Sequence, residues 1–274
     1  MKKSVNIGYF ENKLGMTLAE VLPILKDAGF TALDINPPFR ETDCLALSAE
    51  RKKLCDKYGF EIVQTHAPFN RYGSYGDKMP TILERAYEGT KLMGAKYWVV
   101  HGDEFDINKC EYTPEAALAY NYELYAPYVE RAEKDGIGIA FETVFADSRP
   151  YPRLCSKYDE LAAMIAKFGS DRVCCCWDFG HANVAFGSEQ YENMRKMGSL
   201  LKCTHIHDNN GKSDQHLMPF YGTIDWKAYI NVMREIGYDG TLSLEFSGAG
   251  KFTPEFMPTF AKYAYDTLVC FENL

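Results

Sequence analysis

The segment Gly94-Ala95-Lys96-Tyr97-Trp98-Val99-Val100-His101-Gly102-Asp103 begins with a glycine, continues as an apolar run and ends in polar side chains. A helix-length amphipathic stretch, residues 79–93, precedes the glycine. Glycine readily adopts the left-handed conformation that ends helices, and a short apolar run after it is typical of a buried strand. The segment therefore predicts a helix, a buried strand and a polar loop in that order.

The same unit recurs along the whole chain. Eight apolar runs have strand length, at residues 5–10, 31–35, 61–65, 97–100, 137–141, 173–177, 203–206 and 241–244. Eight helical stretches follow them, at residues 17–28, 48–58, 79–93, 113–135, 155–168, 189–199, 225–236 and 254–270. Eight alternating units predict an α/β fold, a (β/α)8 TIM barrel, as a single domain over residues 1–274. A doubly wound open sheet is the alternative, but the glycine-rich phosphate-binding motif that it often carries is absent.

Composition narrows the class of protein. The chain has 274 residues, of which 46% are hydrophobic and 25% charged, as is ordinary for a globular protein. Its formal net charge of −8 has the wrong sign for long-range attraction to nucleic acid or an anionic membrane. The nine cysteines include no Cys-x-x-Cys pair, and we find neither a signal peptide nor a membrane-spanning apolar run. We therefore expect a cytoplasmic protein.

Potential metal ligands stand where the predicted strands end. In a barrel of this type the active site lies at these strand ends. All six histidines of the chain fall at or just after them, and carboxylates accompany them; the set is His66, His101, Glu142, Asp178, His181, His205, His207, Asp214, His216 and Glu245. A mixture of imidazole and carboxylate ligands suits Mn, Zn, Co or Fe better than Ca or Mg. The sequence therefore predicts a divalent metal ion.

In combination, Asp178-x-x-His181, His205-x-His207, Asp214-x-His216 and Glu245 resemble the motifs of the xylose-isomerase-like TIM-barrel superfamily. This superfamily includes sugar isomerases, ketose epimerases, inosose dehydratases and the endonuclease IV group (AP endonuclease family 2). The resemblance spans the chain in order. It implies a TIM barrel and a metal held by a Glu, an Asp, a His and a Glu from strands five to eight.

By position, the resemblance assigns the metal to Glu142, Asp178, His207 and Glu245. His205 lies two residues from His207 and would share its face of the strand; we expect His207 to be the ligand and His205 to lie one layer deeper. The nuclease branch has further ligands, whose counterparts would be His66, His101, His181, Asp214 and His216. We interpret Asp214 and His216 as metal ligands and the three histidines as substrate contacts. The opposite reading, in which all five hold metal, stays open.

The resemblance implies a sugar or sugar-phosphate isomerase or epimerase that acts by proton transfer. A metal that chelates adjacent oxygens of the sugar stabilises the enediolate, and a carboxylate must take the proton. Glu142 and Glu245 end strands five and eight, so we expect them to be the acid/base pair as well as ligands. The expected partner is a small sugar, with a homo-oligomer left open.

Three alternatives remain. The first is a phosphodiesterase on abasic DNA, which the ligand set favours, although the net charge and the lack of a Lys/Arg cluster oppose nucleic-acid binding. The second is dehydration of a keto-sugar or inosose, and the third is a barrel that only binds sugar or metal. Basic loop residues could hold a substrate phosphate or carboxylate, namely Arg71, Arg149, Arg153, Lys212 and Lys251. Aromatic residues near the strand ends could wall the site, among them Phe39, Phe69, Phe145, Phe246 and Phe252.

Overall fold

The computed structural model describes residues 1–69, 75–108, 110–147, 151–247 and 252–274. Eight parallel strands form one sheet in the order β7-β6-β5-β4-β3-β2-β1-β8. Their bounds are β1 Lys2–Asn6, β2 Ala32–Asp34, β3 Glu61–His66, β4 Tyr97–His101, β5 Gly138–Glu142, β6 Val173–Asp178, β7 Leu201–His205 and β8 Thr241–Leu244. Strands that follow one another in the chain are therefore neighbours in the sheet, as in a TIM barrel.

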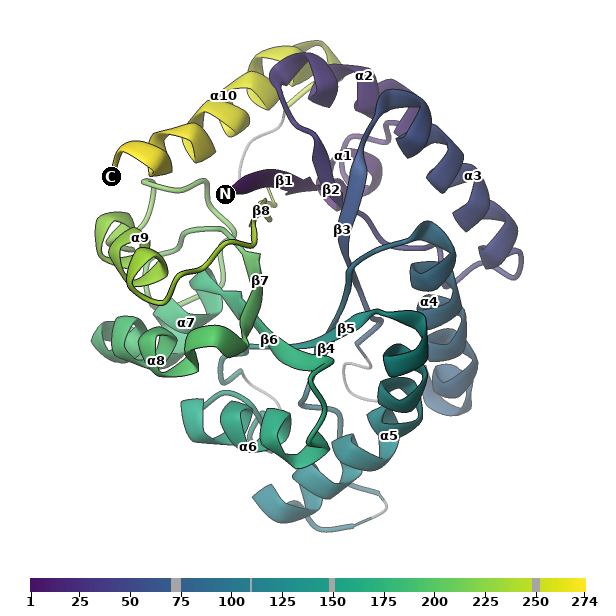
Figure 1. Cartoon of the computed structure of the whole chain (residues 1–274), viewed down its shortest axis with the longest axis vertical. Helices are drawn as coiled ribbons and strands as arrows, with labels where there is room; N and C mark the ends of the chain where they lie inside the picture. The colour runs from purple at the N-terminus through teal and green to yellow at the C-terminus, as the bar shows by residue number, and fades with distance from the viewer. Residues whose placement is uncertain (70–74, 109, 148–150, 248–251) are drawn as a thin grey trace.

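The sheet closes on itself between its two outer strands. Ile206, directly after β7, forms a parallel bridge with Leu244 of β8. The Ile206 amide donates to the Ser243 carbonyl oxygen at 2.7 Å, and the Glu245 amide donates to the Ile206 carbonyl oxygen at 2.9 Å. Figure 1 shows the strands as a central ring with the helices outside it. The fold is the (β/α)8 TIM barrel that the sequence predicts.

Helices follow the strands and pack on the outside of the barrel (Figure 1). The longer ones are α2 Leu18–Ala28, α3 Cys44–Tyr58, α4 Met79–Met93, α5 Pro114–Asp135, α6 Tyr158–Phe168, α7 Phe179–Phe186, α8 Gln190–Met197, α9 Trp226–Glu235 and α10 Met257–Cys270. Gly94 ends α4 with φ 69° and Gly136 ends α5 with φ 76°, in the left-handed region. No helix in the described part of the chain is both long enough and apolar enough to cross a membrane.

Two of the differences from the sequence-based prediction lie at strand ends. The strand expected at residues 5–10 ends at Asn6, because the Asn6 Oδ1 atom accepts from the Gly8 amide at 2.8 Å and turns the chain into α1 (Gly8–Asn12). The short helix α7 was not predicted. It begins directly after β6, since the Asp178 carboxylate at its N-terminus accepts from the His181 amide at 2.6 Å.

The core has two layers. Val99, Ala140, Cys174, Cys176 and Cys203 form a buried cluster inside the barrel, while Cys175 belongs to the larger core between strands and helices. This division follows the alternation of side chains along a strand. Glu142 lies two residues after Ala140 on the same strand, and residues two apart point to the same side. The alternation therefore places the Glu142 side chain inside the mouth of the barrel.

Candidate metal centre

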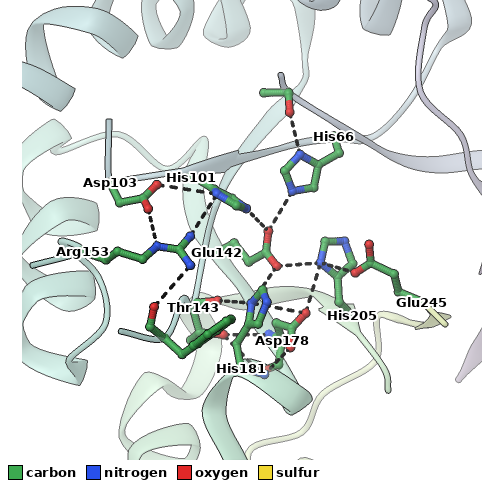
Figure 2. Close-up of polar contacts among 12 residues, drawn as sticks. His66, His101, Asp103, Glu142, Thr143, Arg153, Asp178, His181, His205 and Glu245 are labelled. Carbon is green, nitrogen blue, oxygen red and sulfur yellow. Dashed lines mark hydrogen bonds and ion pairs between the residues drawn. The ribbon is translucent and has the colours of Figure 1, made fainter. Parts of the chain in front are cut away.

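The Glu142 carboxylate, at the end of β5, is the centre of the candidate site (Figure 2). Its Oε2 atom lies 2.8 Å from His66 Nε2 and 3.1 Å from His101 Nε2. Its Oε1 atom lies 3.0 Å from His205 Nδ1 and 3.3 Å from His181 Nδ1. Four imidazoles from four strand ends or their following turns therefore meet at one buried carboxylate.

One group of potential ligands comes from strands five to eight. Donor atoms of Glu142, Asp178, His205 and Glu245 all lie within 4.8 Å of one another. Within it, His205 Nδ1 is 3.3 Å from Glu245 Oε2 and 3.8 Å from Asp178 Oδ2. We expected His207 to complete this group and His205 to lie one layer deeper; in the structure it is His205 whose donor atom lies with the three carboxylates. β7 ends at His205, so the rule that residues two apart share a face does not extend to His207.

His207 belongs instead to a second group, with His181, Asp214 and His216, whose donor atoms also lie within 4.8 Å of one another. Asp214 Oδ2 is 3.0 Å from His216 Nε2 and 3.4 Å from His181 Nε2. The His207 and His216 rings stack at 3.9 Å. His66, His101 and Glu142 form a third group. Glu142 belongs to the first and third groups, and Asp178 connects the first to the second because its Oδ1 atom lies 3.0 Å from His207 Nε2.

The turn after β6 is shaped by Gly180. A Cβ atom at this position would lie 1.9 Å from Cε1 and 2.2 Å from Nδ1 of the His207 ring. Only glycine therefore lets this buried imidazole approach the turn and reach Asp178. The spacing Asp178-x-Gly180-His181 thus serves three purposes: it caps α7, makes room for His207 and directs His181 toward Glu142.

Opposite charges balance within the site. Burial would raise the pKa of Glu142, but the neighbouring His205 and His101 charges hold it well below its usual range. Burial would lower the pKa of His101, but the Glu142 charge and the hydrogen bond with Asp103 raise it to about 9. The pKa of His216 is likewise raised to about 9, against its burial, by Asp214 and Glu245. Without metal, protons on His101 and His216 therefore offset part of the negative charge of the carboxylates.

The donor set fits a divalent metal. The Asp214 Oδ1 atom is buried without a hydrogen-bond partner among the described residues. His205 directs Nδ1 toward the carboxylates, and its Nε2 atom lies 3.5 Å from Asp34 Oδ2. A carboxylate behind a ligating histidine is a common way to orient that ligand. Buried carboxylate and imidazole donors at these separations suit Mn, Zn or Co, whose identity the donors leave open.

A cavity of about 490 Å³ opens above these groups, a size ordinary for small-molecule sites. His66, His101, His181, Asp214 and His216 line it together with Glu142 and Glu245, whereas Asp178, His205 and His207 lie beneath. Phe39, Phe69, Phe145 and Phe246 line it as predicted, whereas Phe252 does not.

Of the basic residues proposed from the sequence, Arg153 reaches the cavity, where it is buried and donates from Nε to Asp103. Lys212 does not line it, and Arg71, Arg149 and Lys251 lie outside the described residues. Sequence reasoning missed Asn6 and Asn36, although they stand at the ends of strands one and two. Asking which polar residues end every strand would have found both. The Asn36 Oδ1 atom accepts from the His66 amide and so helps to position that histidine.

Comparisons with known proteins agree with this fold. The model of the xylose isomerase-like TIM barrel family matches residues 22–261. An uncharacterized protein of Methanocaldococcus jannaschii, MJ1311, is 30% identical over 202 residues, which is 70% of this chain and 67% of that protein. A solved D-tagatose 3-epimerase-like protein is 25% identical with a TM-score of 0.77, over 100% of this chain and 99% of the other. A D-psicose 3-epimerase, solved in the presence of D-fructose, is 17% identical with a TM-score of 0.75, over 98% of each chain. The chain belongs to the family of xylose isomerase-like TIM barrels.

Proposed function

We propose that this chain is a divalent-metal-dependent isomerase or epimerase of a sugar or sugar phosphate. The proposal rests on one observation. Four potential metal ligands lie together at the barrel mouth, below a cavity of small-molecule size: Glu142, Asp178, His205 and Glu245. The likeness to the D-tagatose 3-epimerase-like protein supports a sugar-modifying reaction.

The four residues of this group would hold the metal. Mn, Zn or Co bound here would act as a Lewis acid that polarises sugar oxygens and stabilises negative charge beside the carbonyl. His66, His101 and His181 line the cavity and could donate to other sugar oxygens. Phe69 stacks over the His101 ring at 5.0 Å and presents an apolar wall that restricts water.

The two glutamates have different surroundings. The Glu142 side chain is 2% exposed and contacts four imidazoles, of which His205, His101 and His181 hold it ionised. The Glu245 side chain is 25% exposed and lines the cavity. We therefore assign to Glu245 the removal of the proton from the carbon next to the carbonyl and its return to the sugar, and to the ionised Glu142 a role in positioning. Because their closest donor oxygens lie within 4.8 Å of each other, the sugar would lie over the pair rather than between them.

The test is hydrogen exchange between sugar and solvent. Metal-loaded protein is incubated in D₂O with a panel of ketoses and ketose phosphates, and deuterium in each sugar is measured by NMR. We expect exchange with at least one sugar, and a fall of at least about 100-fold in Glu245→Gln, since a positioned base contributes 10²–10⁴-fold. Glu130→Gln, an exposed carboxylate on α5, is the matched control and should retain the wild-type rate. No exchange with any sugar, or full exchange in Glu245→Gln, would refute the assignment.

A second candidate is a metal-dependent phosphodiesterase. The observation that favours it is the presence of three adjacent ligand groups, since sites with more than one metal suit phosphate-ester hydrolysis. Cleavage of a duplex that contains one abasic site, measured with the same metal-loaded protein, separates the two proposals. Cleavage without any sugar exchange would favour the phosphodiesterase.

A further inference from the structure

A second cavity, of about 450 Å³, lies beside the candidate metal centre. His216 and Phe246 line both cavities, so the two are contiguous. The remaining walls come from the segment between β7 and α9, which supplies Met218 and Tyr221, and from residues leading into and along α10, which supply Phe252, Phe256, Phe260 and Tyr263.

Aromatic rings make up most of the wall. Phe252 stacks on Phe256 at 5.3 Å and packs against Phe260 at 4.8 Å, and Phe260 in turn contacts Phe246 at 4.8 Å. Phe260 and Phe246 are buried and form the base of the cavity, whereas Phe256 is 43% and Tyr221 69% exposed. Exposed aromatic rings grouped around a hollow are typical of a binding site for an apolar group.

The chemistry of this cavity differs from that of its neighbour. Among the described residues that line it, His216 is the sole imidazole and none is Asp, Glu, Lys or Arg. The first cavity contains carboxylates, imidazoles, Lys13 and Arg40. A polar sugar or a phosphate would therefore bind in the first cavity, and the second would take a flat apolar group.

The position of the apolar cavity beside the first cavity indicates what kind of group would occupy it. Phe246 contacts Tyr9 at 5.0 Å on the side of the first cavity and Phe260 on the side of the second. The imidazole of His216 belongs to the second ligand group and also lines the apolar cavity. A group bound in the apolar cavity would thus be held directly beside the metal centre, as a substituent of the same molecule would be.

We propose that the substrate is a sugar bearing an aryl or comparably bulky apolar substituent, which binds in the cavity lined by Phe252, Phe256 and Tyr221 while the sugar binds over the metal centre. This inference rests on the proposed function and names its substrate class. Contact of a phenyl ring with these rings would remove apolar surface from water, and we expect it to strengthen binding about 10- to 100-fold relative to a methyl group.

The experiment uses three probes on the metal-loaded full chain: phenyl β-D-glucopyranoside, methyl β-D-glucopyranoside and phenol. Saturation-transfer NMR and titration measure their binding to wild type, Phe256→Ala and Tyr221→Ala, with Tyr122→Ala, an exposed aromatic on α5, as the matched control. We expect the aromatic protons of phenol and of the phenyl glucoside to receive saturation in wild type and Tyr122→Ala, with at least about fivefold weaker binding in both cavity variants. Melting temperatures close to that of wild type show that the variants are folded.

Two results would overturn the inference. Aromatic protons that receive no saturation, or equal saturation in wild type and both cavity variants, would show that the cavity does not bind an aryl group. A dimer in sedimentation that Phe256→Ala dissociates would show that a second copy of the chain covers these rings. Failure of the proposed function is distinguishable, because phenol would still bind in the cavity while no sugar exchanges deuterium.

Discussion

Metal binding should compete with protons on the imidazoles, and His216 gives the clearest case. Burial lowers its pKa, but the hydrogen bond with Asp214 and the Glu245 charge raise it to about 9. At pH 7 the protonated form then exceeds the neutral form by about 100-fold, and at about 1.36 kcal/mol per pKa unit, displacing this proton costs about 2.7 kcal/mol. That penalty falls to about 1.4 kcal/mol at pH 8 and disappears above pH 9. Affinity of the second ligand group for metal should therefore rise about tenfold per pH unit for each such histidine.

Isothermal titration with Mn²⁺ or Co²⁺ at pH 7, 8 and 9, each in two buffers of different ionisation enthalpy, measures both the affinity and the protons released. We expect proton release at pH 7 that declines toward pH 9. In His216→Gln, metal binding to the second ligand group should release one proton fewer than in wild type. His101→Gln is the parallel variant, because the pKa of His101 is also about 9. Equal affinity at pH 7 and 9 with no proton release would refute this electrostatic reasoning.

Three further predictions concern the scaffold of the site. Gly180→Ala should destabilise the fold by about 1–3 kcal/mol in chemical denaturation, because the new methyl group would lie 1.9 Å from the His207 ring; an unchanged midpoint would contradict the close approach. Asp34→Asn should weaken metal affinity about 10- to 100-fold through His205 Nε2, which lies 3.5 Å away, and Asp27→Asn, exposed on α2, should leave it unchanged. Metal-free protein should lose stability as pH rises through about 9, because His101 and His216 bind protons more tightly in the folded chain than in the unfolded chain. Their contribution to the free energy of unfolding is complete only below about pH 6.5. The metal-free protein should also lose stability in acid. The pKa values of Glu142 and Asp178 are depressed in the fold, so their contribution to stability is lost as they are protonated. A flat melting temperature from pH 6 to 10 would contradict the predicted loss at high pH.

The barrel could be predicted because each strand repeats one local pattern, and the strand-end rule then located Glu142, Asp178 and Glu245 without any contact information. The preference for His207 over His205 came from the family resemblance and not from contact information. In the structure β7 ends at His205, whose donor atom lies with the three carboxylates, and His207 lies in the second group.

Other features depend on the path of long segments. His216 has a φ of 47° and Phe220 of 74°, which are left-handed conformations uncommon for residues other than glycine. No local pattern indicates where such residues will occur, so the apolar cavity beside His216 could not be read from the sequence, and Asp214 was connected with His181 only through the family resemblance.

The central claim is that buried carboxylates and imidazoles at the barrel mouth hold a divalent metal. The most direct test is elemental mass spectrometry of protein purified without chelator, together with Asp178→Asn and the control Glu130→Gln. The account predicts at least one Mn, Zn or Co ion per chain in wild type and the control, and loss of that ion in Asp178→Asn. A folded wild-type chain that contains no such ion, and binds none when Mn²⁺, Zn²⁺ or Co²⁺ is added in excess, would contradict it.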